Sequence, residues 1–221
     1  MNNQQARELL LISENRLLRK DGDLVATVPL ALGPTKVFAY THLFATAPQL
    51  LSYLEEKLSS TLKIAKEQLE PRPTLTGYRG YFGGHSFPDI PSWVEEVMQV
   101  LATAYGENST LGDEDTELSI SKTEANCLED EEGNLVVRLS EKNKESSTFR
   151  GLFLAAPGLL EKAEAMAKEG MEEIDREYES GKTFDPLGAN ESRFIVPDQL
   201  RYLCDLVAKA RGASPLNKIT T

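Results

Sequence analysis

Two stretches of this sequence, residues 43–55 (LFATAPQLLSYLE) and residues 152–164 (LFLAAPGLLEKAE), follow the same pattern. Both read L-F-x-x-A-P-x-L-L-x-x-x-E, and the second begins 109 residues after the first. Self-similarity at a fixed distance along a chain is typical of a duplicated structural unit. A duplication predicts that the similarity extends into the flanking sequence.

The similarity does continue on both sides. Residues 15–17 match 126–128 and residues 21–25 match 132–136 at an offset of 111, while residues 91–104 match 197–210 at an offset of 106. The matches at 21–25 and 132–136 place an acidic residue, a glycine and a polar residue before an apolar run, which predicts a β-hairpin. Generic amphipathic helices also align easily, but three blocks in the same order favour an internal duplication.

Each unit is predicted to contain three strands, a long helix and a second helix. The expected elements of the first unit are strands near 8–12, 15–19 and 24–30 and helices over 48–69 and 93–105. Those of the second unit are strands near 117–122, 125–129 and 134–140 and helices over 157–179 and 198–211. Thr46 with Gln49 resembles a capping box, so the first long helix is expected to begin near Pro48. Residues 35–45 are expected to form an additional helix, kinked or broken before this proline.

These elements predict an α+β fold made of two tandem, similar lobes. Each lobe is expected to have a small antiparallel sheet of three strands, packed by a long helix and a second helix, because a sheet with one apolar face needs a covering layer. The first repeat unit is assigned to residues 1–109 and the second to residues 117–221. Residues 110–116 form an acidic linker between them.

The charge of the chain is concentrated in one segment. The sequence has 24 basic and 35 acidic residues, a net charge of −11, and residues 106–132 contain ten acids and one base. This excess of acid argues against direct binding to the DNA or RNA backbone. Asp113, Glu114 and Asp115 are candidate contacts for a basic surface on a partner. The alternative is a solvated linker that runs into a hairpin.

Composition favours a cytoplasmic protein. Two cysteines among 221 residues do not make a disulfide framework. The N-terminus lacks the basic and apolar order of a signal peptide, and no apolar run reaches the roughly 18–20 residues of a membrane span.

Motifs for catalysis are not found in the sequence. It has no G-x-S-x-G elbow, no phosphate-binding loop, and no ligand spacing among its two cysteines and two histidines. We therefore expect no catalytic residues, no metal and no cofactor, and a protein that is not an enzyme.

The most unusual stretch is the loop 77–85, GYRGYFGGH. Its four glycines allow close approach of the backbone, and its aromatic and arginine side chains can stack and form forked hydrogen bonds. Arg79, Tyr81, Phe82 and His85 are the candidate recognition residues. The alternative is an irregular connection whose aromatic residues cover the sheet.

Residues 43–51 and 152–160 resemble a helix-start segment, A-A-P-x-L-L, of small phage and prophage accessory proteins, in which it follows a hairpin region. Such proteins frequently bind host proteins and include inhibitors of host defence. The resemblance implies a non-enzymatic protein that acts in the host cytoplasm on a host protein or nucleoprotein complex.

Two other function classes stay open. One is a small-molecule or nucleotide-binding protein, or an enzyme, that uses the loop 77–85. The other is a structural or assembly protein in which the duplication replaces a homodimer.

Overall fold

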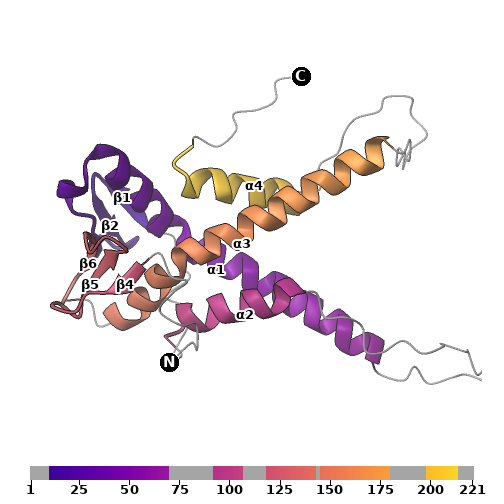
Figure 1. Ribbon diagram of the computed structural model, residues 1–221, viewed down its shortest axis with the longest axis horizontal. Helices are drawn as coiled ribbons and strands as arrows, with labels where there is room; N and C mark the ends of the chain where they lie inside the picture. Colours follow the sequence, from indigo (N-terminus) through magenta and orange to yellow (C-terminus); the bar gives the residue numbers. More distant parts are fainter. Residues whose placement is uncertain (1–9, 70–91, 107–117, 143–144, 180–197, 214–221) are drawn as a thin grey trace, which may run out of the picture.

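The computed structural model shown in Figure 1 describes residues 10–69, 92–106, 118–142, 145–179 and 198–213. Its strands are β1 (Leu11–Ser13), β2 (Arg16–Leu18), β3 (Leu24–Thr27), β4 (Leu118–Ile120), β5 (Cys127–Asp130) and β6 (Leu135–Leu139). Its helices are the short 3-10 helix η2 (Leu30–Leu32) and the α-helices α1 (Pro34–Leu69), α2 (Ser92–Ala104), α3 (Ser146–Glu179) and α4 (Asp198–Ala210). The predicted α+β class is confirmed.

The strands of both units form one antiparallel sheet in the order β1-β2-β3-β6-β5-β4. The two halves of this sheet join where β3 pairs with β6, through Ala26 opposite Leu139 and Thr27 opposite Arg138. The prediction placed a separate three-stranded sheet in each lobe, and the structure differs on this point. Pairing between the units covers the open edges that β3 and β6 would otherwise expose.

The hairpins of the two halves have the same internal hydrogen bonds. In the β2–β3 hairpin the Gly22 N–H donates to the Arg19 carbonyl, and in the β5–β6 hairpin the Gly133 N–H donates to the Asp130 carbonyl, both at 2.9 Å. These two glycines are 111 residues apart and have φ angles of +92° and +78°, a region that favours glycine. The predicted turns are therefore confirmed, and the repeat extends to individual hydrogen bonds.

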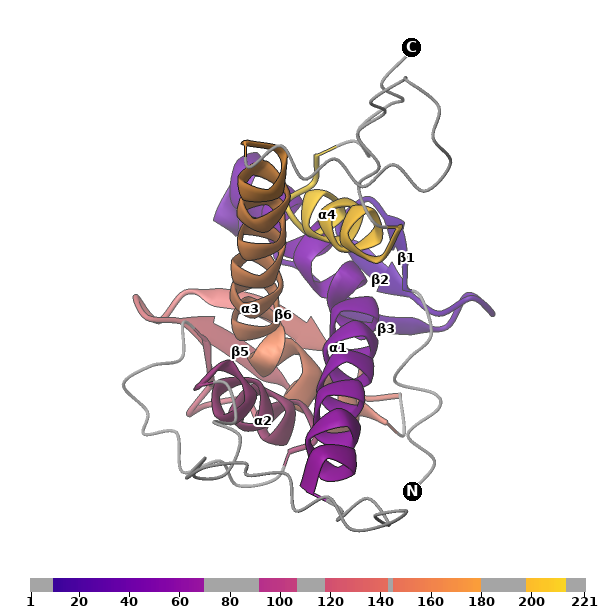
Figure 2. The ribbon, with the colours of Figure 1, turned by 90° about the vertical axis from the view of Figure 1, so that its right-hand side faces the viewer.

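The helices lie on one side of the sheet, as Figures 1 and 2 show, and the core lies between these layers. The long helices α1 and α3 cross each other (Figure 1). The rings of Phe44 and Phe153, which lie in the first third of each helix, meet with their centroids 4.7 Å apart. Both phenylalanines are fully buried, and they hold the same position in the two copies of the L-F-x-x-A-P pattern. The centre of the core is thus a contact between equivalent residues.

The long helices begin earlier than predicted. The helix expected over 35–45 is confirmed, but it continues through Pro48 as part of α1, so the expected break before this proline is wrong. Pro157 likewise lies inside α3. Thr46 is not an N-cap, because its hydroxyl donates to the His42 carbonyl one turn back in the same helix, at 2.9 Å. An interior proline costs a helix about 3 kcal/mol. Burial of the surrounding turns, which include Phe44 and Leu50, offsets that cost.

Each short helix packs most extensively on the long helix of the other unit. The helix α2 of the first unit lies mainly on α3, and α4 of the second unit lies on α1 and also contacts α3. The order of strands and α-helices is the same in both halves, but their packing is exchanged between them. No helix in the described part of the chain is long and apolar enough to span a membrane.

Candidate functional site

The site residues expected from the sequence lie outside the described residues. Arg79, Tyr81, Phe82 and His85 fall in the range 70–91, and Asp113, Glu114 and Asp115 fall in the range 107–117. Their roles stay predictions, as does the linker assigned to 110–116.

The described part of the acidic segment forms β4, β5 and the β5–β6 turn. Asp130 organises this turn, since its carboxylate accepts hydrogen bonds from the backbone N–H groups of Glu132 and Asn134 at 3.1 and 2.8 Å. Although partial burial opposes the shift, the hydrogen bonds from Asn134 and the Lys36 ammonium lower the pKa of Asp130. This acid therefore has a structural role, whereas Glu131 and Glu132 are exposed.

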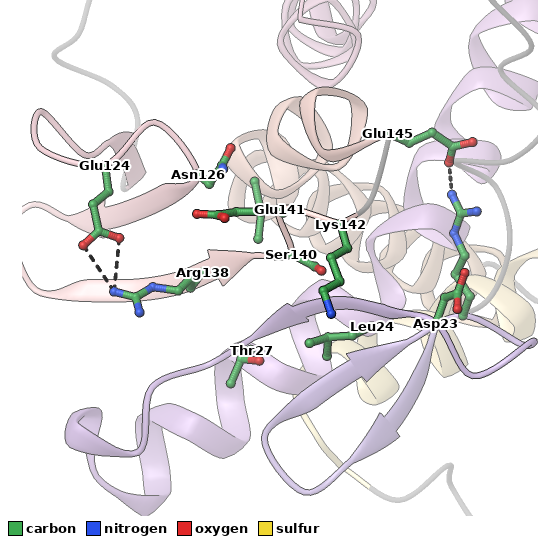
Figure 3. Close-up of a pocket in the computed structure, with 12 residues that line it drawn as sticks. Asp23, Leu24, Thr27, Glu124, Asn126, Arg138, Ser140, Glu141, Lys142 and Glu145 are labelled. Atoms are coloured by element: carbon green, nitrogen blue, oxygen red, sulfur yellow. Dashed lines mark hydrogen bonds and ion pairs between the residues drawn. The ribbon is translucent and has the colours of Figure 1, made fainter.

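A groove of about 840 Å³ lies over the seam between β3 and β6 (Figure 3). The first unit lines it with Arg19, Asp23, Leu24 and Thr27, and the second with Glu124, Asn126, Arg138, Leu139, Ser140, Glu141, Lys142 and Glu145. The two units bring these residues together because Thr27 and Arg138 are direct partners in the β3–β6 register. The groove is thus a product of pairing between the units.

The charged groups of the groove include two ion pairs, drawn as dashed lines in Figure 3. Arg138 Nη2 lies 3.1 Å from Glu124 Oε2, and the Arg19 guanidinium pairs with Glu145. Arg19 also lies over the Phe149 ring, 5.5 Å from its centroid, so the ion pair and the ring contact together hold its position. Its Nε atom is buried and makes no hydrogen bond within the described residues.

Cys127 lies beside the groove but is a poor nucleophile. Its thiol is buried and donates to the Glu124 carboxylate at 3.1 Å. Burial, together with this hydrogen bond, raises the pKa of the Cys127 thiol and disfavours the reactive thiolate. Cys127 and Cys204 are both free, and Cys204 is half-buried. Among the described residues, no cluster of histidine, cysteine and acidic side chains could hold a metal ion.

The lining of the groove determines what it can bind. Seven of its twelve residues are charged, four acidic and three basic, and only Leu24 and Leu139 are apolar. Sites for small molecules are mostly apolar with a few polar groups. A lining of mixed charge can instead complement the charged side chains of a polypeptide segment.

The sequence contains only an indirect signal for this groove. The two matched hairpins indicate where its residues lie within each unit, but not that β3 pairs with β6. Comparison with protein-family models, with curated proteins and with solved structures finds no match to this chain.

Proposed function

We propose that this chain is a non-enzymatic binding protein of phage type that acts on a host protein or nucleoprotein complex and inhibits a host defence. The observation that supports binding most directly is the groove over the β3–β6 seam, which both units line with mainly charged residues. The phage origin and the host target come from the resemblance of the two A-P-x-L-L segments.

A basic segment of the partner fits this groove best. Four acidic and three basic side chains line it. Outside its two ion pairs, the acids Asp23 and Glu141 stand against one base, Lys142. Contacts between exposed charges mainly increase the rate of association and weaken as salt rises. The acidic residues Asp113, Glu114 and Asp115 are proposed to attract the same kind of surface.

The test is retention of a partner from a bacterial lysate by the tagged full chain. Glu141→Lys reverses one charge in the groove and Ser140→Trp fills part of it, so both changes should reduce retention at least tenfold. The matched control is Glu173→Lys, which makes the same charge change at an exposed position of α3. Glu173 lies about 40 Å along this helix from its first residue, Ser146. Equal retention by all variants would exclude the groove as the binding site.

Two further measurements on the purified chain distinguish the other function classes. Mass spectrometry of the purified chain would detect a bound metabolite, which would favour the small-molecule alternative that uses the loop 77–85. Ordered self-assembly without any captured partner would favour the assembly alternative.

A further inference from the structure

We propose that charges at the contacts between the two units select pairing of the first unit with the second and oppose pairing of two like units. This proposal concerns only the contacts between the two units of the chain. It does not involve the host partner proposed above. Its test is therefore independent of binding.

Two pairs of equivalent positions carry the proposal. Arg19 and Asp130 have the same place in the two hairpins, where their backbone N–H groups donate to the carbonyls of Asp23 and Asn134 at 2.8 and 3.0 Å. These two residues are 111 positions apart, which is the offset of the hairpin match. Lys36 and Glu145, 109 positions apart, lie at the starts of α1 and α3.

Each hairpin residue forms an ion pair with the helix start of the other unit. Arg19 of the first unit pairs with Glu145 of the second. Asp130 of the second unit pairs with Lys36 of the first, with Oδ2 and Nζ 3.6 Å apart. The two contacts are equivalent in position but opposite in polarity, since the hairpin provides the cation in one and the anion in the other.

This reversal makes like units incompatible. Two first units paired in the same way would place Arg19 against Lys36, and two second units would place Asp130 against Glu145. The side chains of Asp130 and Glu145 are 10% and 27% exposed, and those of Arg19 and Lys36 are 15% and 50% exposed. Water and salt therefore screen the repulsion between Asp130 and Glu145 less than they screen a repulsion between two surface charges, and they screen the repulsion between Arg19 and Lys36 more strongly.

The strand seam adds a third mismatch. Thr27 and Arg138 are equivalent at the offset of 111, and they face each other in the β3–β6 register. Two second units would place Arg138 opposite Arg138, and like charges directly opposite each other destabilise a sheet. The unlike pairing found here places the uncharged Thr27 there instead.

The test exchanges charges in the full chain without changing its composition. In Lys36→Glu with Glu145→Lys, both contacts between unlike units become repulsive, while both contacts between like units become attractive. We expect the melting temperature to fall by about 4–8 °C, because two ion pairs become repulsions. We also expect a dimer in sedimentation velocity at high protein concentration, because like units can pair only between two chains.

The control is Arg19→Glu with Glu145→Lys, which contains the same change at 145 but keeps both contacts between unlike units attractive. It should melt well above the first variant, although it loses the contact of Arg19 with the Phe149 ring, and it should have the same oligomeric state as the natural chain. The difference in melting temperature between the two variants should narrow from 50 mM to 1 M salt. If the first variant is largely unfolded at 50 mM salt, the dimer is sought at 1 M salt, where screening should restore folded chain. Equal melting temperatures, or a lower one without any dimer, would overturn the proposal.

Discussion

The contact of α2 with α3 and the contact of α4 with α1 are equivalent in the repeat, but their chemistry differs. Where α2 meets α3, Lys162 Nζ pairs with Glu96 at 2.8 Å. At the equivalent positions of the other contact, the rings of Tyr53 and Tyr202 meet with their centroids 6.2 Å apart. A duplicated fold can therefore keep the place of a contact while the type of interaction changes completely.

Glycine explains why α2 lies closer to its long helix. A Cβ atom at Gly151 would lie 2.8 Å from the Ala104 carbonyl oxygen, and one at Gly158 would lie 3.2 Å from the Val100 side chain. The residues at the equivalent positions of α1 are His42 and Gln49, which have side chains. The α2–α3 contact is accordingly the more extensive of the two.

The largest loss of stability is expected where α1 and α3 cross, because the two halves have the same residue there. Phe44→Ala and Phe153→Ala should each lower the free energy of unfolding by about 3–5 kcal/mol, because each removes a fully buried ring from the α1–α3 crossing. Denaturant melts of both single variants and the double variant measure this. Because the rings touch, the double variant should lose less than the sum of the two. Strict additivity would show that the two rings do not act as one contact.

A smaller effect is expected from removing the close approach of α2 and α3. Alanine has a better helix propensity than glycine, but Gly151→Ala would push a Cβ atom into backbone atoms of α2. We expect a net loss of about 1–3 kcal/mol in the free energy of unfolding. His42→Ala at the equivalent position of α1 is the control and should cost less than about 1 kcal/mol. A gain in stability for Gly151→Ala would mean that helix propensity outweighs the contact.

The smallest losses of stability are expected at the Lys162–Glu96 ion pair and at the Tyr53–Tyr202 contact. The two losses should differ in their dependence on salt. Glu96→Gln should cost about 0.2–1 kcal/mol, and the loss should shrink in high salt, whereas Tyr202→Leu should cost a similar amount at any salt concentration.

The hydrogen bond to Glu96, opposed in part by burial, raises the pKa of Lys162. The stability that this ion pair contributes is therefore fully present below the unfolded pKa of lysine. It is lost as pH rises through the pKa of Lys162 in the folded chain. Melts at two salt concentrations and across alkaline pH provide the check, and a salt-independent cost of Glu96→Gln would contradict it.

Local features of the fold could be predicted from the sequence. The strands β3 and β6 follow hairpin turns whose glycines have positive φ, and the α-helices of the described residues lie within or around their predicted ranges. These features depend on residues that are neighbours along the chain. The sequence predicted α1 as two helices, over 35–45 and 48–69, because a proline usually marks the first turn of a helix. Only tertiary packing allows Pro48 to lie inside one continuous helix.

Contacts between the units could not be predicted. Nothing local to β3 or β6 specifies that they pair with each other, or that α2 lies mainly on α3. The groove depends on that pairing, so no single stretch of sequence contains it. The opposite polarity of Arg19 and Asp130 is visible once the repeat is aligned, but its meaning depends on knowing which residues they contact.

The exchange of helices also has a consequence during protein synthesis. When β3 leaves the ribosome, its partner β6 has not been made, and more than 100 further residues must be added. At the usual speed of translation this delay is on the order of 10 s. During that time β3 has an open edge. Once α2 has been made, it still lacks α3, the helix on which it packs most extensively in the finished fold. The half-made chain is therefore the form most exposed to aggregation and to capture by chaperones.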